Sequence, residues 1–311
     1  MKIRVLGSAA GGGFPQWNCN APLSRAVREQ RPGFLARTQS SVAASADGTS
    51  WAIFNASPDI RQQIAATPDL NPRPDGPLRH SPIKAVVLTN ADVDHIAGLL
   101  SLREGTPFVI YASERVLATL AANSVFNVLT PAVVERRVLP LDGVTDLEGP
   151  DGPLGLSVET FPVPGKVALF LEDEGAADGR FGSAPGDTIG LALRSGGAPQ
   201  TIFYIPGCAA VPDALKARLA GAACLLFDGT VYTDTEMPDA GVGSKTGTRM
   251  GHMAISGPAG SLAALAGIDV GRKIYVHINN TNPILMPGSA AERAVTASGW
   301  EIGYDGMELE L

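Results

Sequence analysis

The chain has 311 residues, 45% of them hydrophobic, so it can bury a sizeable core as one large α/β domain or as two average ones. Its formal net charge of −7 argues against nucleic acid as a main partner, because phosphate binding needs concentrated lysine and arginine. There is neither an apolar run of about 18 residues that could cross a membrane nor a signal peptide, and three widely spaced cysteines indicate a reducing compartment, so we expect a cytoplasmic protein without membrane insertion.

The first half of the chain predicts alternating strands and helices. A glycine-rich loop at 7–13 follows the first strand, and we interpret it as a turn that lets the backbone pass close to a site. In chain order, the predicted elements are strands at 2–6, 40–45, 51–55 and 83–88, a helix capped by Ser57, a helix over 94–102, a strand at 108–111 and a helix over 113–122.

The second half is richer in strands. Its predicted elements are strands at 138–141, 156–163, 187–194, 201–205, 223–227, 273–278 and 307–311, and helices at 212–220, 256–266 (capped by Ser256) and 289–298. The acidic segment 172–186 predicts a mobile surface loop, and the long segment 232–251 predicts a lid or binding loop. Because no linker or internal repeat interrupts the chain, we expect a single domain over 1–311.

A polar cluster lies between the strand at 83–88 and the helix that follows it. Asp92, Asp94 and His95 fall within four residues, at the end of a buried strand where α/β sheets usually bind ligands. Their oxygen and nitrogen atoms suit a divalent metal ion. Aspartates at such a junction also serve as plain helix N-caps, so the spacing alone leaves both interpretations open.

Three residues of the second half are further candidates. His277 interrupts the last apolar strand and is followed by Asn279, and a buried imidazole is costly without partners, which favours a metal ligand. His252, between the lid-like segment and a predicted helix, is a candidate general acid–base or a bystander of the helix cap. Asp228 ends a strand and is a candidate ligand, an acceptor for a metal-bound histidine, or a turn residue.

The stretch around Asp94 resembles the HxHxDH signature of the metallo-β-lactamase superfamily. Asp94 and His95 match its last two positions, whereas Asn90 and Asp92 stand where that superfamily has histidines. Together with GSAAGGGFPQWNCN near the N-terminus and HINNTNPIL near the C-terminus, this altered motif is similar, nearly end to end, to the coenzyme PQQ synthesis protein B (PqqB) family. The resemblance implies an α/β fold, a metallo-β-lactamase-like αββα sandwich.

The resemblance also implies one divalent metal ion. Of the two superfamily metal sites, one has lost its ligands here, and the other keeps Asp94, His95 and His277. Two histidines and one carboxylate form the facial triad of non-haem Fe(II) oxygenases, so we favour Fe(II) over Zn, with O₂ as co-substrate. Asp92 is expected as a fourth ligand or as a neighbour of the ligands.

The cysteines are expected to lie outside the metal chemistry. The family's CxCxxC motif keeps only Cys19, with Ala21 and Ser24 at its other positions, and a closed zinc site needs four ligands, so no structural zinc is expected there. Cys208 follows Gly207 where the superfamily carries a bridging aspartate, and a packed thiol is favoured over a soft ligand.

The resemblance predicts a role in pyrroloquinoline quinone (PQQ) biosynthesis, with hydroxylation of the tyrosine in a peptide-derived Glu–Tyr precursor. In this hypothesis His252 is the acid–base, Arg249 pairs with a substrate carboxylate, and Asp228 and Asn279 support the ligands or the substrate. Lys166 is expected to be a solvated loop residue.

Other functions remain open at this stage: a two-metal hydrolase, a carrier of PQQ or its precursor to the periplasm, or a structural or regulatory partner. The partners expected are a small peptide-derived substrate and other PQQ biosynthesis proteins. The sequence alone determines neither the identity of the metal, nor the pathway stage of the substrate, nor whether the protein is a homodimer.

Overall fold

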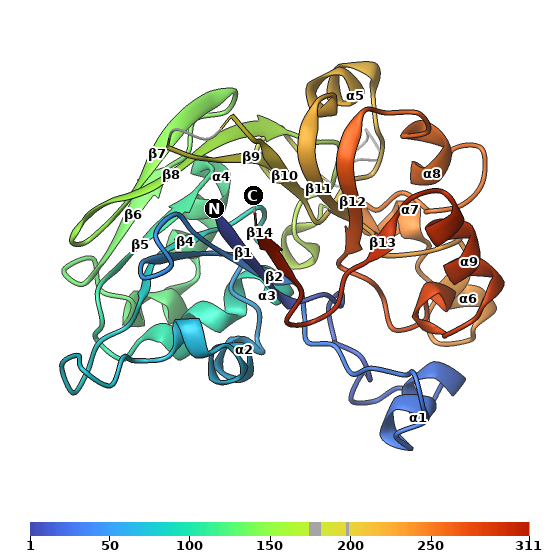
Figure 1. Cartoon of the computed structure of the whole chain (residues 1–311), viewed down its shortest axis with the longest axis horizontal. Coiled ribbons are helices and arrows are strands. Elements are labelled where there is room, and N and C mark those ends of the chain that lie inside the picture. Colours follow the sequence, from blue (N-terminus) through green and yellow to red (C-terminus); the bar gives the residue numbers. More distant parts are fainter. Residues whose placement is uncertain (174–181, 197–198, 311) are drawn as a thin grey trace.

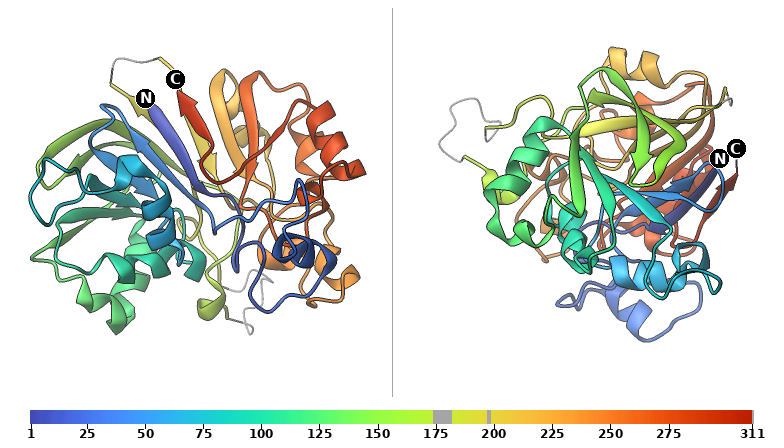
Figure 2. Two further views of the ribbon diagram at one scale, coloured as in Figure 1. Left: turned by 60° about the horizontal axis from the view of Figure 1, so that its bottom comes forward. Right: turned by 90° about the vertical axis from the view of Figure 1, so that its left-hand side faces the viewer.

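The protein is described here by a computed structural model that covers residues 1–173, 182–196 and 199–310. Two seven-stranded sheets pack face to face, and helices cover their outer surfaces (Figures 1 and 2). This arrangement confirms the predicted αββα sandwich. The chain begins and ends in neighbouring strands of one sheet, which brings the two termini together (Figure 1).

The first sheet has the strand order β14-β1-β2-β3-β4-β5-β6. Its strands from β3 to β6 run parallel, and the remaining pairs are antiparallel. The strands are β1 (Lys2–Gly7), β2 (Ser41–Ser45), β3 (Trp51–Phe54), β4 (Ile83–Val87), β5 (Phe108–Ala112), β6 (Val134–Val138) and β14 (Glu308–Glu310).

The second sheet has the order β13-β12-β11-β10-β9-β8-β7, with parallel pairing from β10 to β13. Its strands are β7 (Gly143–Gly149), β8 (Gly152–Pro162), β9 (Ile189–Ser195), β10 (Ile202–Ile205), β11 (Ala222–Asp228), β12 (Val270–Val276) and β13 (Glu301–Ile302). Each sheet therefore has one parallel half, and the carboxyl ends of parallel strands are the usual place for a ligand.

Three clusters of buried apolar side chains hold these layers together. The first lies between the sheets and includes Val87 of β4 and Leu226 of β11. The other two lie between each sheet and its own helices, where Val86 and Leu225 pack. Because the central strands are buried on both faces, their sequences are continuous apolar runs, the feature from which β4 and β11 are predicted.

The helices are short. They are α1 (Pro22–Arg28), α2 (Ile60–Ala66), α3 (Val93–Ile96), α4 (Glu114–Ala122), α5 (Asp213–Leu219), α6 (Glu236–Asp239), α7 (Gly247–Met250), α8 (Ser261–Ala264) and α9 (Ala290–Ala297). Short 3₁₀ turns are η1 (Pro68–Leu70), η2 (Ala97–Leu102), η3 (Ser124–Val128), η4 (Leu169–Leu171) and η5 (Pro283–Leu285). In the described part of the chain no helix is long and apolar enough to cross a membrane.

Two predicted helix caps are wrong. The hydroxyl of Ser57 donates to the Gln63 side chain, and α2 begins three residues later, at Ile60. The hydroxyl of Ser256 donates to the carbonyl of Tyr232, so the predicted helix shrinks to α8. In both cases the serine hydroxyl that the sequence pattern assigned to a cap donates to another group instead, Gln63 of the same helix for Ser57 and the distant Tyr232 for Ser256.

Other differences concern segments without a strong apolar pattern. The strand predicted at 138–141 is wrong except for Val138, the last residue of β6, and the sequence pattern did not predict α1, β7 or β13. The segment 232–251 contains α6 and α7 instead of being a plain loop. Of the acidic segment 172–186, residues 174–181 lie outside the described residues.

Candidate metal centre

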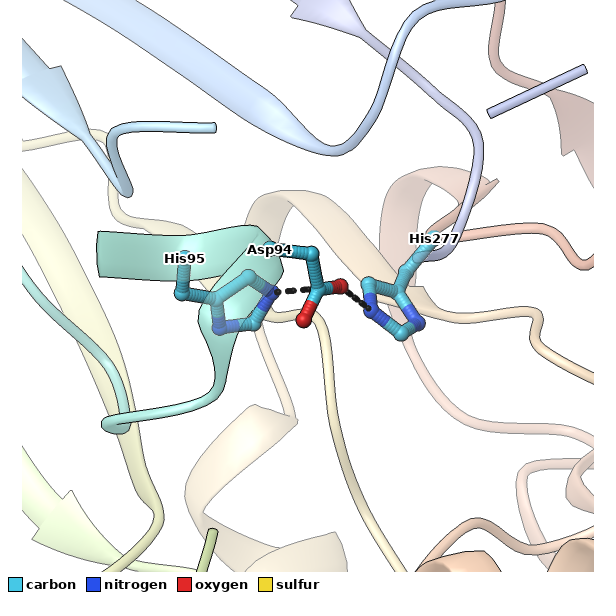
Figure 3. A group of neighbouring side chains, drawn as sticks. All are labelled: Asp94, His95 and His277. Atoms are coloured by element: carbon cyan, nitrogen blue, oxygen red, sulfur yellow. Dashed lines mark hydrogen bonds and ion pairs between the residues drawn. The ribbon is translucent and has the colours of Figure 1, made fainter. Parts of the chain in front are cut away.

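The three candidate ligands Asp94, His95 and His277 come together where the two sheets meet (Figure 3). Asp94 and His95 lie in α3, the next element after β4 of the first sheet, and His277 lies directly after β12 of the second. The Asp94 carboxylate lies between the two rings, with Oδ2 3.9 Å from Nε2 of His95 and 3.1 Å from Nε2 of His277. Neighbours in sequence and a residue 183 positions away thus share one centre.

One ring nitrogen of His95 is available to bind a metal ion. Its side chain is 1% exposed, and its Nδ1 lies 2.6 Å from Oδ1 of Asn90. Its Nε2 is buried and has no hydrogen-bond partner among the described residues. Burial lowers the pKa of His95 to about 4, so the ring is neutral near pH 7 and keeps a lone pair for a cation.

His277 is held in an unusual backbone conformation. Its φ of 56° lies in the left-handed region, which residues other than glycine rarely occupy and which is typical of functional sites. Its Nδ1 donates to Oγ1 of Thr230 at 2.7 Å, and that hydroxyl donates to Oδ1 of Asp228 at 2.6 Å. Burial opposes a charge on the ring, but the neighbouring Asp94 carboxylate raises the pKa of His277 overall.

These donors fit a divalent metal ion. Two ligand atoms that each lie about 2.1 Å from a tetrahedral metal are about 3.4 Å apart, and the distances of 3.1 and 3.9 Å bracket that value. The unpartnered Nε2 of His95 is a further indication, because buried polar atoms normally have partners. The prediction that the glycine-rich loop at 7–13 passes close to the site is confirmed, since a Cβ on Gly11 would lie 3.5 Å from the Asp94 carboxylate.

His252 and Asp228 form a dyad beside this centre. Nδ1 of His252 donates to Oδ2 of Asp228 at 2.6 Å, and the His252 ring stacks on His277 with centroids 5.1 Å apart. The three residues are close enough to suggest a second metal site. However, Asp228 also accepts from the backbone of Cys208 and from the backbone and hydroxyl of Thr230, so its oxygens are already saturated. Asp228 therefore orients the two histidines.

Asp92 lies next to the centre but not in it. Its Oδ2 accepts from Nδ2 of Asn90 at 3.0 Å, and it is absent from the groups whose ligand atoms converge in the described part of the chain. Burial, together with the neighbouring Asp94 carboxylate, raises the pKa of Asp92. The role of Asp92 as a fourth ligand or as a neighbour of the ligands stays a prediction, while Asp94, His95 and His277 converge on the candidate centre.

The predicted substrate residues have mixed placements. Arg249 pairs through both terminal nitrogens with Glu172, which is also bound by Lys166 at 2.8 Å. The expectation that Lys166 is solvated is wrong, since its side chain is 14% exposed and its stem packs against Gly251, next to His252. Asn279 contacts no candidate ligand. Its Nδ2 donates to Oγ1 of Thr281.

Two of the buried cysteines make local hydrogen bonds through their sulfur atoms. The Cys208 thiol donates to the carbonyl of Ala210 at 3.0 Å, and burial raises the pKa of this thiol to about 12. The Cys19 sulfur accepts from the backbone of Ala21 at 3.4 Å. The absence of a structural zinc at Cys19 stays a prediction.

Two residues of the centre were not predicted as site residues. Asn90 was noted only as a departure from the histidine of the signature, and Thr230 was passed over as part of a turn. For Asn90 the signal was its position five residues before His95. For Thr230 the only signal was its place two residues after Asp228, at the end of a buried strand.

The comparisons with known proteins agree with this geometry. The chain matches the model of the family described as "Beta-lactamase superfamily domain" over residues 50–278. It is 52% identical to coenzyme PQQ synthesis protein B of Rhodopseudomonas palustris (strain BisB5) and 51% identical to that of Methylobacterium radiotolerans, with 100% of each chain covered.

Solved structures show the same relationship. The structure of Zn(2+)-bound PqqB from Methylobacterium extorquens superposes with a TM-score of 0.93 at 50% identity, covering 100% of both chains. A diphosphatase from the PhnP family superposes with a TM-score of 0.68 at 19% identity, covering 100% of this chain and 96% of the other. The second likeness shows a shared fold.

Proposed function

This chain belongs to the coenzyme PQQ synthesis protein B family of the metallo-β-lactamase superfamily, with a role in PQQ biosynthesis, and from this premise we propose that it is a mononuclear non-haem iron hydroxylase. Its substrate is the tyrosine of a peptide-derived Glu–Tyr precursor. The relative from Methylobacterium extorquens was solved with zinc. Because zinc has no redox chemistry, we propose that Fe(II) is the ion of the active protein.

The observation that carries this proposal is the set of donors itself. Asp94, His95 and His277 supply one oxygen and two nitrogens toward a single point, and the second nitrogen of each histidine is already bonded elsewhere. Such a set of two histidines and one carboxylate leaves coordination positions open, which is the arrangement of non-haem Fe(II) oxygenases.

Bound Fe(II) would supply the activation of O₂. The reaction replaces an aromatic C–H bond by C–OH with one oxygen atom of O₂, and the other oxygen leaves as water. The balance requires two electrons and two protons, so the assay must contain a reductant of the ascorbate class.

The chain's own residues then have defined tasks. Asp228 binds Nδ1 of His252, so Nε2 is the nitrogen left to exchange a proton with the substrate phenol. Arg249 is our proposed partner for a substrate carboxylate, in competition with Glu172. The segment 232–251, which carries α6 and α7, would cover the substrate and exclude water.

The test compares two metal ions in one protein. Metal-free protein is reloaded anaerobically with one equivalent of Fe(II) or, as the matched control, Zn(II), and is then given a Glu–Tyr dipeptide, ascorbate and ¹⁸O₂. We expect the dipeptide to gain a labelled oxygen atom with iron and none with zinc. Binding of the dipeptide without oxygen gain would overturn the hydroxylase in favour of the carrier.

The hydrolase remains the contrasting outcome. A two-metal hydrolase needs ions that hold both the attacking and the leaving oxygen. The saturated oxygens of Asp228 argue against a second ion at Asp228, His252 and His277. Two tightly bound ions per chain, together with cleavage of the dipeptide, would overturn our proposal.

A further inference from the structure

One buried carboxamide touches two of the candidate metal-binding side chains. Asn90 is 6% exposed and lies between β4 and α3. Its Oδ1 lies 2.6 Å from Nδ1 of His95 and 3.0 Å from the backbone nitrogen of Asp92. Its Nδ2 lies 3.0 Å from Oδ2 of Asp92. This single side chain therefore contacts a ligand, a neighbouring carboxylate and the backbone that carries both.

The orientation of this carboxamide follows from chemistry alone. Oxygen and nitrogen of an asparagine are hard to tell apart by shape, and their assignment depends on the surrounding bonds. A backbone N–H can only donate and an ionised carboxylate can only accept. The atom facing the Asp92 backbone must therefore be the oxygen, and the atom facing the Asp92 carboxylate must be the nitrogen.

That orientation fixes the proton on His95. The Asn90 oxygen can only accept, so Nδ1 of His95 must carry the hydrogen. In a neutral imidazole the other nitrogen is then a bare lone pair. This is Nε2, the buried atom that has no hydrogen-bond partner among the described residues and that faces Asp94.

We propose that Asn90 is the positioning residue of the metal centre. Its oxygen sets His95 in the tautomer that binds metal through Nε2, and its nitrogen holds the Asp92 carboxylate beside the ion. A residue that stands where the superfamily has a histidine ligand thus acts on the metal through two neighbours. The inference rests on the proposed metal centre and is independent of its oxygen chemistry.

The test measures metal binding in the full chain with Zn(II) and Co(II). We expect Asn90→Ala to weaken Zn(II) binding by about 10- to 100-fold, the usual effect of losing a partner of a metal-bound histidine. Asn90→Asp keeps an oxygen for His95 and for the backbone but faces Asp92 with a like charge. It should therefore keep the His95 tautomer and change the Co(II) absorption spectrum.

The control is another buried carboxamide. Gln63 is 2% exposed and makes three hydrogen bonds, to Ser57, Thr38 and the carbonyl of Gln39, none of them to a candidate ligand. Gln63→Ala should lower the melting temperature without changing Zn(II) affinity or the Co(II) spectrum. Wild-type affinity and spectrum in Asn90→Ala would overturn the inference.

A measurement on the unmodified protein covers the case in which Asn90→Ala fails to fold. In Zn(II)-loaded protein with ¹⁵N-labelled histidine, His95 should show a protonated Nδ1 and a metal-bound Nε2. Metal on Nδ1 would overturn the inference without any variant. A protein that binds Zn(II) as expected but fails to hydroxylate would overturn only the proposed function.

Discussion

The two sides of the metal centre hold their histidines in different ways. On the side of the first sheet, His95 is fixed by Asn90, a residue five positions earlier in the same turn. On the side of the second sheet, His277 is fixed by Thr230, 47 positions earlier, which also contacts Asp228 and His252. The hydrogen bond on the first side is local in sequence, whereas those on the second side join the ends of two strands and a loop.

This difference has a functional consequence. A change on the first side should alter only His95 and Asp92, because Asn90 contacts no other candidate ligand. A change on the second side should alter the metal ligand His277 and the proposed acid–base His252 together, because Thr230 contacts both rings and Asp228 contacts His252 and Thr230. The hydrogen bonds that join the metal ligand His277 to the proton-transfer group His252 thus lie on the side of the second sheet.

The largest effect is expected from His277→Ala. The variant removes one of three ligands and leaves Asp94 with a single histidine partner. Loss of a residue that only hydrogen-bonds to a ligand weakens metal binding by up to about 100-fold, so we expect the loss of a ligand to weaken it by more. Metal content after dialysis against a chelator measures it. His80→Ala is the control, since this remaining histidine hydrogen-bonds to Arg73 and Pro77 and to no candidate ligand among the described residues. Equal metal content in the two variants would contradict the assignment of His277 as a metal ligand.

His252→Gln should separate the two roles within the second side. The ring stacks on His277 but donates to Asp228, so we expect metal content to stay unchanged. The rate constant kcat should fall by about 10²- to 10⁴-fold, the usual contribution of a general acid–base. Metal titration and turnover on the same preparation measure both quantities. Loss of the metal with an unchanged rate per bound ion would instead make His252 a ligand.

The sequence predicted the first side of the centre better than the second. Asp94 and His95 follow a strongly apolar strand, and their spacing and order are visible in thirteen consecutive residues. The strand β12 was also predicted, and an imidazole after it was unusual enough to be noticed. Such features depend on near neighbours in the chain, which is why they could be predicted.

The hydrogen bonds of the second side could not be predicted, because they depend on which strand ends come together in the fold. Thr230 has an ordinary place in a turn, and only the pairing of β11 with β12 brings it to His277. The pairing of Lys166 and Arg249 with Glu172 has the same origin, since these residues come from separate segments. The helix cap predicted at Ser256 failed for a related reason, because its hydroxyl bonds to the carbonyl of the distant Tyr232.

Thr230→Val tests the coupling on the second side. It keeps the shape of the side chain but removes the hydroxyl between His277 and Asp228, so both lose a buried partner. We expect metal affinity to fall by about 10- to 100-fold and the free energy of unfolding to fall by about 1–3 kcal/mol. Thr160→Val is the control, because the buried Thr160 hydroxyl has no partner in the described part of the chain. If both variants have the same metal affinity and the same free energy of unfolding, the Thr230 hydroxyl does not couple His277 to Asp228.

The smallest effect on the centre itself is expected from Glu236, which ties the segment 232–251, just before His252, to the loop after His277. Its carboxyl is 7% exposed and accepts from the Thr281 hydroxyl and from the backbone of Tyr232. Burial raises the pKa of Glu236 to about 7 from an ordinary value of 4.5. The folded state therefore keeps a proton that the unfolded state has lost, and stability should fall as the pH rises from about 4.5 to about 7, by a total of about 1–3 kcal/mol.

Glu236→Gln should abolish that part of the pH dependence, because the amide stays neutral at every pH. Urea unfolding at pH 5 and pH 8 measures it, with the exposed Glu114→Gln as control. We expect the difference in unfolding free energy between the two pH values to shrink in Glu236→Gln and to stay unchanged in the control. Because the hydrogen bonds of the Glu236 carboxyl in the described residues go to Tyr232 and Thr281 and not to a ligand, metal binding by Asp94 and His95 should be the same in both variants. An unchanged pH dependence in Glu236→Gln would mean that protonation of Glu236 does not contribute to the stability of the folded state.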